Sequence, residues 1–379
     1  MKERRPFVIA VSSNYNNSNN RQVFLIGFLC GLLCLSFAGR SSAAEETPAA
    51  PVEPAATTPI SEGPSTAEIV AAIKHRAEQI LEERRKARQL QFSGDITQAI
   101  AYERNPSNAA NHKGDTYEET DLSLYLSKKL TPTITWQALY YGSYDAYFRY
   151  TDGTYTNHTL TPVKLLWRPG RMWRVDSAVD LTYLGYPDSR PSTYDEIKPS
   201  IGVRQNLWGT WYQGARYEWL YRYYPSKKAQ DGITGTDTRF NRQDTRHRLR
   251  YELGTTWLDT LIKVRNDWIF HDSNDQNQDQ YDSTSYRVNA ALYRPITQKL
   301  SANFNYSYEL KRLRHKPVGN VTPDRSRHDE IESWTLAGIY DLNNTWSVSP
   351  SYTYSHLNST DPLYEYFDWT AQVSVTARF

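Results

Sequence analysis

The segment from Phe367 to Phe379, FDWTAQVSVTARF, decides the fold, because apolar and polar residues alternate along it without interruption. Successive side chains of a β-strand point to opposite faces, so this segment forms a strand with one apolar and one polar face. A strand at the edge of a soluble sheet seldom keeps such alternation over thirteen residues. The pattern is typical of a strand that lies between lipid and water.

The same alternation recurs toward the N-terminus, most regularly in 346–355, 300–309 and 211–223, and less regularly in 155–168 and 328–340. Short turns and longer polar loops separate the segments in alternation, which is the connectivity of outer-membrane barrels. Short turns are predicted near 131–132, 168–170, 207–208, 258–259, 295–296 and 343–344, and long loops near 187–194, 224–243, 272–280 and 313–328.

The number of strands follows from the same count. Thirteen segments follow Thr116, and residues 94–103 supply the further strand that an even-numbered barrel needs. Twelve or sixteen strands are the alternatives. The sequence therefore predicts an all-β fold, a closed antiparallel transmembrane β-barrel of about 14 strands over residues 93–379.

The composition agrees with a barrel. Mean hydropathy is only -0.71, yet aromatic residues make up 13% of the chain. A water-facing inner wall explains the first value, and aromatic belts at the two membrane surfaces explain the second. Trp173 and Tyr183 lie ten residues apart, as do Trp211 and Tyr221, and Trp369 and Phe379. We expect Trp173, Trp211, Trp369 and Phe379 at the membrane interface.

The N-terminus has the pattern of an export signal. An apolar run at 23–39 follows a basic start and leads to the small residues Ser42 and Ala44, so residues 1–44 are predicted to be a signal peptide. A retained membrane anchor is the alternative. Both cysteines, Cys30 and Cys34, would leave with this segment, and the formal net charge would fall from +2 to about −2. That balance gives no support to nucleic-acid binding.

Two further segments precede the barrel. Residues 45–64 are rich in Pro and Ala and are predicted to be an extended, disordered linker. Residues 65–92 are predicted to form a periplasmic amphipathic α-helix, which begins with a capping box of Ser65 and Glu68. Its apolar stripe needs a partner, either a periplasmic protein or a second copy of this chain.

Charged residues are expected on the inner wall of the barrel, because an arginine on the lipid side near mid-membrane costs about 2–4 kcal/mol. The predicted pore-lining residues are Arg204, Arg216, Glu218, Arg222, Arg248, Arg250, Glu252, Lys263, Arg265, Asp267 and Arg287. Bases outnumber acids in this set, which favours anions. The alternative is a set of cross-strand ion pairs that stiffens the wall without selecting a solute.

Catalysis and metal binding have weak support. The chain has 8 His, and no set of Ser, His and Asp converges by sequence as a catalytic triad requires. The acidic run at 272–280 lacks the glycine and the final glutamate of an EF-hand loop. We expect no cofactor and no metal site.

The signal region 23–44, the alternating segments and the ending 373–379 together resemble Gram-negative outer-membrane β-barrels of the porin or channel type. The terminal Phe379 is similar to the signal that the barrel-assembly machinery reads. The resemblance implies an outer-membrane location, with membrane lipid and that machinery as partners. We expect a passive channel for small, anionic or sugar-like solutes. An export barrel for polysaccharide or protein is the alternative, and a surface enzyme is a third.

Overall fold

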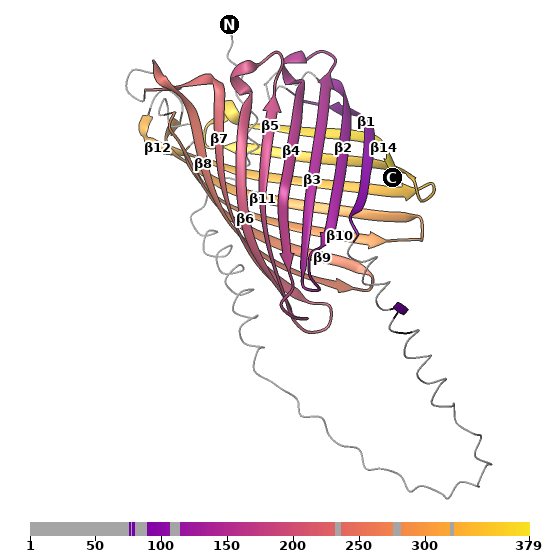
Figure 1. Ribbon diagram of the computed structural model, residues 1–379. Helices are drawn as coiled ribbons and strands as arrows, with labels where there is room; N and C mark the ends of the chain where they lie inside the picture. The colour runs from indigo at the N-terminus through magenta and orange to yellow at the C-terminus, as the bar shows by residue number, and fades with distance from the viewer. Residues whose placement is uncertain are drawn as a thin grey trace, which may run out of the picture. The chain divides into compact units, whose positions relative to one another are not determined.

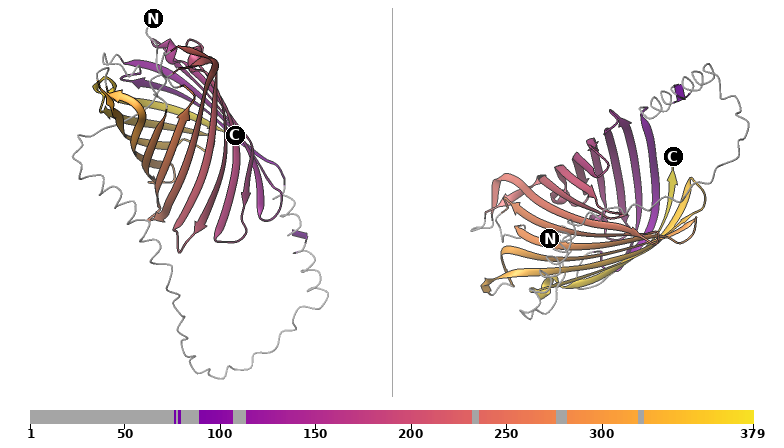
Figure 2. Two further views of the ribbon diagram at one scale, coloured as in Figure 1. Left: turned by 90° about the vertical axis from the view of Figure 1, so that its left-hand side faces the viewer. Right: turned by 90° about the horizontal axis from the view of Figure 1, so that it is seen from below.

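The fold is a closed β-barrel (Figure 1). The computed structural model describes residues 76, 78–79, 89–106, 114–231, 236–275, 282–318 and 322–379. Every strand pairs antiparallel with its neighbours in sequence, and β1 pairs with β14. The prediction of a closed antiparallel barrel of 14 strands is confirmed. Figure 2 shows the curved wall from the side and from below.

The strands are β1 (Gln91–Glu103), β2 (Asp115–Lys129), β3 (Ile134–Tyr147), β4 (Tyr155–Trp167), β5 (Trp173–Gly185), β6 (Tyr194–Asn206), β7 (Tyr212–Gln230), β8 (Asp237–Trp257), β9 (Thr260–Ser273), β10 (Ser283–Pro295), β11 (Leu300–Val318), β12 (Thr322–Asp341), β13 (Trp346–Ser359) and β14 (Tyr366–Arg378). Short 3₁₀ turns lie at η1 (Thr151–Gly153), η2 (Arg190–Ser192) and η4 (Pro362–Tyr364). Among the residues described, no helix has both the length and the apolar character needed to cross a membrane.

The C-terminal residue closes the barrel against the first strand. The backbone N–H of Gly94 donates to the carbonyl of Phe379 at 2.9 Å, and the N–H of Phe379 donates back at 2.9 Å. The Phe379 ring lies 6.1 Å from that of Phe92. A Cβ at residue 94 would stand 2.8 Å from this ring and from the Ser123 carbonyl, so only glycine fits there.

The two faces of the wall differ in chemistry. Residues paired directly across an antiparallel ladder point to the same face. Large apolar side chains cover the outer face, where Ile96, Leu336 and Val373 are 46%, 53% and 50% exposed. The other face carries most of the charged and hydroxyl side chains and forms the inner wall.

Two predicted loops are wrong. Most of 224–243 belongs to the hairpin of β7 and β8, and most of 313–328 belongs to that of β11 and β12. These four strands have 19 to 21 residues, against 13 to 15 in the others. The sequences of their outer ends have runs of consecutive polar residues. Because alternation marks only the part of a strand that faces lipid on one side, the extensions carry no such signal.

The irregular alternation of 155–168 has a local cause. The register shifts between Gln137 and Leu139 in the β3–β4 ladder and between Leu160 and Val163 in the β4–β5 ladder. Pro162 lies in the second shift and has no N–H to donate, so a bulge accommodates it. After a bulge, each residue points to the face opposite to the one that simple alternation predicts. The alternation of apolar and polar residues is therefore interrupted in the sequence.

The segments before the barrel are described only in part. The predicted signal peptide 1–44 and linker 45–64 lie outside the described residues. Within 65–92, Arg76, Glu78 and Gln79 are helical. Because β1 begins at Gln91, the last two residues assigned to the helix belong to the barrel instead. The rest of that helix, and with it the partner expected there, falls outside the described residues.

Candidate functional site

The inner wall is the candidate site, because the ladder register brings chemically related side chains together there. The eleven residues predicted to line a pore lie on β6 to β10. Their register places them on one face: Arg216 lies opposite Arg250, Glu218 opposite Arg248, and Asp267 opposite both Arg250 and Arg287. That face is the polar one, opposite to Tyr217 and Leu249 of the outer surface.

Most of the bases among them are paired with acids. We call Arg216, Arg222, Arg248, Arg250, Arg265 and Arg287 the arginine ladder. Its ion pairs are Arg216 with Asp176, Arg222 with Glu196 (2.8 Å), Arg248 with Glu218 (3.0 Å), Arg250 with Glu218 (3.4 Å) and Asp267 (2.8 Å), Arg265 with Asp267 (3.5 Å), and Arg287 with Glu309. Beside it, Lys263 lies 3.8 Å from Glu252, and the Arg204 guanidinium stacks 3.5 Å over the Tyr212 ring.

Sequence reasoning missed three of these acids. Glu196 on β6 and Glu309 on β11 lie on strands next to the ladder, and Asp176 on β5 lies one strand further away; none was counted among its partners. Asp176 and Glu309 occupy polar positions of alternating segments, so extending the same parity to every strand would have found them. Each of the three pairs with one arginine of the ladder, so three of the predicted bases have partners that the sequence reasoning did not count.

A second charged region was not predicted. We call Glu103, Asp115, Glu119, Asp121, Asp145 and Asp368 the acidic wall; they come from β1, β2, β3 and β14. Glu119 lies opposite Asp145, and Glu103 lies opposite Asp115. Glu103, Asp115, Asp145 and Asp368 are buried. Within the described part of the chain, no Lys or Arg side chain forms an ion pair with any of the six.

Neutral groups satisfy part of the acidic wall. The Tyr147 hydroxyl donates to Glu103 at 2.6 Å, the Tyr141 hydroxyl to Asp121 at 2.9 Å, and the Gln372 amide to Glu119 at 2.5 Å. Backbone N–H groups donate to Asp115 and Asp368 at 2.8 Å. These donors bring no positive charge, so the region remains acidic.

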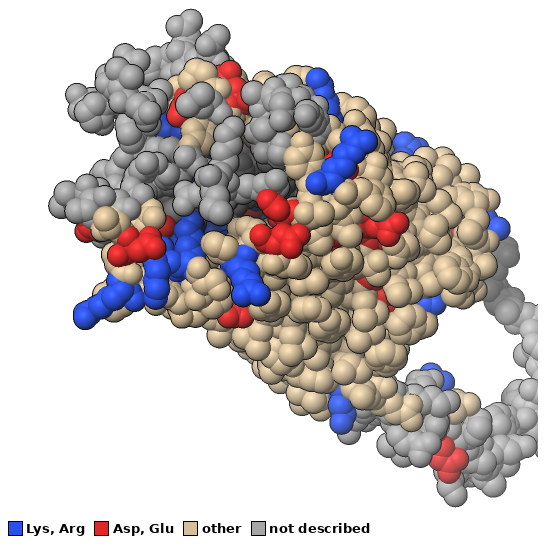
Figure 3. Space-filling model, turned by 90° about the horizontal axis from the view of Figure 1, so that it is seen from above, with Lys and Arg blue, Asp and Glu red and all other residues tan. Residues whose placement is uncertain are grey.

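The two charged regions lie on opposite sides of the ring of strands. The acidic wall is centred on β1 and β2, and the arginine ladder on β8 and β9, which are seven strands away in a closed ring of 14. Between them, β11 to β13 present hydroxyl and amide groups to the inner face: Asn303, Asn305, Ser307, Ser333, Thr335, Thr353 and Ser355. Figure 3 shows both signs of charge on the rim, with Lys and Arg gathered at the lower left.

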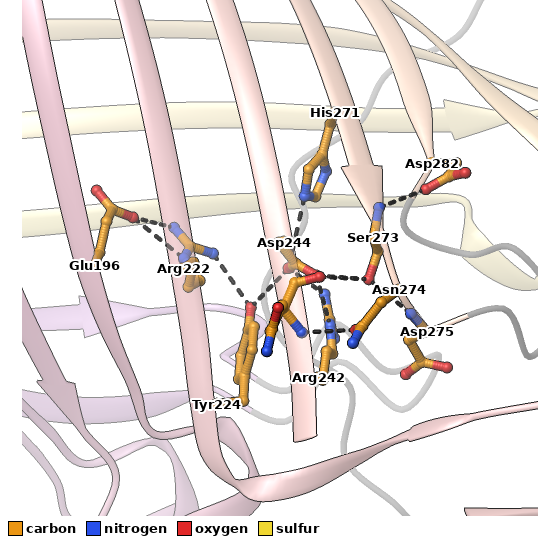
Figure 4. A network of polar contacts seen from close by, with 11 residues as sticks. Glu196, Arg222, Tyr224, Arg242, Asp244, His271, Ser273, Asn274, Asp275 and Asp282 are labelled. Atoms are coloured by element: carbon orange, nitrogen blue, oxygen red, sulfur yellow. Dashed lines mark hydrogen bonds and ion pairs between the residues drawn. The ribbon is translucent and has the colours of Figure 1, made fainter. Parts of the chain in front are cut away.

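A buried polar network joins β7, β8 and β9 near their loop ends (Figure 4). Asp244 accepts from Arg242 at 2.6 and 2.9 Å, from the Ser273 hydroxyl at 2.6 Å and from Tyr224 at 3.2 Å. His271 lies 3.6 Å from the same carboxylate. A serine nucleophile is hydrogen-bonded to the imidazole that acts as its base. The Ser273 hydroxyl is instead hydrogen-bonded to Asp244. The network therefore fits structural support better than catalysis.

No metal centre is present among the described residues, since none of their His, Cys, Asp and Glu side chains group as metal ligands do. The acidic run at 272–280 extends into residues beyond the described part. Asp275 is buried there, and Asp272 is not.

The predicted interface residues lie at the two ends of the strands. Trp173 and Trp211 are 43% and 40% exposed and lie beside short turns, as does Phe379. Trp369 lies toward the loop end of β14, where its ring packs 5.4 Å from Tyr102 and 6.0 Å from Tyr352. Closure, an even number of strands and an apolar outer face are together the features of a Gram-negative outer-membrane barrel, and the chain is one.

Solved structures with a similar fold include OmpT, an outer membrane protein of Vibrio cholerae (TM-score 0.47, 9% identity, covering 76% of this chain and 97% of that one). Two proteins of Pseudomonas putida are also similar. OprB has a TM-score of 0.44 at 7% identity, covering 77% and 94% of the two chains. The toluene transporter TodX has a TM-score of 0.40 at 9% identity, covering 76% and 89%. No protein-family model and no curated protein matches the chain by sequence.

Proposed function

We propose that the barrel is a passive diffusion channel for small hydrophilic solutes, sugar-like ones among them. The polar inner wall is the observation that supports this function, because a wall with polar side chains on every strand holds water. Eight strands are filled by their own side chains, whereas sixteen leave an aqueous channel. A ring of 14 strands lies close to the second case.

The sector of β11 to β13 favours sugar-like solutes. Its serine, threonine and asparagine side chains both donate and accept hydrogen bonds, as sugar hydroxyls do. The hydroxyl groups of Thr335 and Thr353, on adjacent strands, are hydrogen-bonded to each other at 3.0 Å, so hydroxyl groups lie side by side on this part of the wall. Such a surface replaces the water around a passing sugar without attracting ions.

A strong preference for anions has less support than the sequence suggested. The arginine ladder attracts anions only where its guanidinium groups lack carboxylate partners, and each of its arginines has one. The pore-lining role of these residues remains part of the proposal, with a weak preference between ions. The export alternative rests on 65–92, and nothing in the described residues favours it.

Liposome swelling tests the channel. Vesicles that contain the refolded chain are diluted into isosmotic solutions of a mono-, a di- or a trisaccharide. We expect swelling whose rate falls as the sugar becomes larger, because the lumen admits solutes by size. Vesicles with heat-denatured chain serve as the control. The absence of swelling in the monosaccharide would contradict the proposal.

A further inference from the structure

Two arginines face each other on the inner wall near the short turns. Arg174 of β5 lies directly opposite Arg204 of β6, and both residues are partly buried. Like charges directly opposite each other across a ladder are unfavourable. A guanidinium group stays protonated in proteins, so the pair cannot relieve its repulsion by losing a proton. The pair therefore needs a negative charge beside it.

Elsewhere the wall provides such a charge. Arg216 lies opposite Arg250 in the same way on β7 and β8. Each of these two arginines forms an ion pair with at least one carboxylate of the wall. Among the described residues, by contrast, no acidic side chain forms an ion pair with Arg174 or Arg204.

The acids nearest to the pair in the register are engaged with other bases. Asp176, on the same face of β5, is paired with an arginine of the ladder. Glu252, in the same row two strands away, lies 3.8 Å from Lys263. The turn between β4 and β5 adds the exposed residues Arg168 and Arg171, which form no ion pair within the described structure either. The register thus leaves no acid of the described chain for the pair.

The two guanidinium groups have donors available. Nε of Arg174 is buried and has no hydrogen-bond partner in the part of the chain that the structure describes. The Arg204 guanidinium stacks 3.5 Å over the Tyr212 ring. Stacking occupies the face of the planar group and leaves the N–H groups at its edge for an acceptor. Buried polar atoms are nearly always hydrogen-bonded in folded proteins, so Nε of Arg174 indicates an acceptor that the described chain does not supply.

The charge and the shape of the pair indicate which acceptor fits. Two guanidinium groups carry two positive charges and present planar sets of N–H groups. A phosphate group matches both features, because it carries up to two negative charges and its oxygens accept two parallel N–H bonds from an arginine. A carboxylate carries one charge, and a single arginine satisfies its two oxygens. The pair therefore fits a phosphate group better than a carboxylate.

From this geometry we propose that Arg174 and Arg204 bind the phosphate group of a small solute within the lumen. The inference rests on the proposed channel and names a class of solute that it takes, sugars that carry a phosphate group. The sector of β11 to β13 suits the sugar hydroxyls, and the arginine pair binds the phosphate. The pair acts locally, so it agrees with a weak preference between simple ions along the rest of the wall.

Competition for bound phosphate tests the site. Phosphorus NMR of inorganic phosphate is recorded with the full chain in an uncharged detergent, at a mildly alkaline pH where phosphate is mainly a dianion. We expect the chain to broaden the phosphate signal, glucose 6-phosphate to reverse the broadening, and glucose and acetate to leave it unchanged. In Arg174→Gln and in Arg204→Gln, affinity for phosphate should fall about tenfold or more, because each variant removes one of the two charged donor groups.

Arg378 provides a matched control. It lies at the same end of the barrel and is paired with Asp341 at 2.9 Å, so Arg378→Gln removes the same charge and should leave phosphate binding unchanged. Both test variants relieve a contact between like charges and should fold as the wild type does, and either one is sufficient for the test. Equal phosphate binding by the wild type and the test variants, no binding by the wild type, or no displacement by glucose 6-phosphate overturns the inference.

The outcome is separate from that of the proposed function. A chain that lets sugars through but does not bind phosphate contradicts the phosphate site alone. A chain that binds phosphate but gives no swelling contradicts the channel alone.

Discussion

Asp267 is the residue on which the arginine ladder depends. Its carboxylate is 0% exposed, bonds to Arg250 at 2.8 Å and lies 3.5 Å from Arg265. Arg287 stands opposite it on the next strand. Asp267 therefore pairs with two arginines, and its loss would leave Arg265 with no ion pair among the described residues, while Arg250 would keep Glu218 and Arg287 would keep Glu309.

We expect Asp267→Asn to lower the free energy of unfolding by about 3 kcal/mol, because breaking a buried ion pair leaves an uncompensated charge. Chemical denaturation in lipid vesicles, followed by tryptophan fluorescence, measures the change. The control is Asp180→Asn, which breaks a more exposed pair with Lys198 at 3.1 Å and should cost about 1 kcal/mol or less. Equal losses in the two variants would show that the ladder does not stabilise the barrel.

Single residues also mark the limit of sequence reasoning. Because the side chains of a strand alternate between its two faces, counting every second residue placed the predicted charged residues on one face. It did not give their partners. Asp176 lies opposite Gly202 in the ladder register and reaches Arg216 one strand further on, a contact that no spacing in the sequence encodes.

At the level of elements, the short turns were predicted well. Proline, glycine and asparagine interrupt the alternation where the chain reverses, and the turns at 168–170 and 343–344 lie between strands as expected. The long hairpins were missed because the sequences of their outer ends have runs of consecutive polar residues and so no alternation. Alternation of apolar and polar residues is required where one face of a strand meets lipid, and it is not required where both faces meet water.

The turn between β8 and β9 is strained. Leu258 and Asp259 have φ values of 45° and 59°, the left-handed conformation of a two-residue type I′ hairpin. Leucine is unfavourable there by about 1 kcal/mol, whereas asparagine is the preferred residue. We expect Leu258→Asn to stabilise the barrel by about 1 kcal/mol in the same denaturation experiment.

Leu342 provides the comparison for that turn. It is 48% exposed in the turn between β12 and β13 and does not have a positive φ. Leu342→Asn should therefore bring no gain. If both variants were more stable than the wild type, the gain would come from removing an exposed leucine and not from relieving backbone strain.

For the whole molecule, closure of the barrel determines which charged residues lie near one another, and the sequence alone did not show this. The strand count, the antiparallel order and the pairing of the first and last strands follow from alternation and an even number. The separation of charge follows only from the ring, because β14 and β3 are far apart in sequence yet contribute Asp368 and Asp145 to one region. Sequence reasoning considered each strand by itself. It therefore predicted the arginine ladder and missed the acidic wall.

In the proposed channel, the face of β12 that carries Thr335 lines a water-filled lumen, while the face that carries Leu336 meets lipid. Both residues lie on β12, one step apart, and Leu336 is 53% exposed. Thr335→Cys and Leu336→Cys are made in a chain whose Cys30 and Cys34 are replaced by Ser. Single-channel current in planar bilayers is then recorded before and after adding a charged methanethiosulfonate reagent. We expect the open-channel current to fall when Cys replaces Thr335 and to stay constant when Cys replaces Leu336; the absence of current, or the opposite pattern, would show that the Thr335 face does not line a channel.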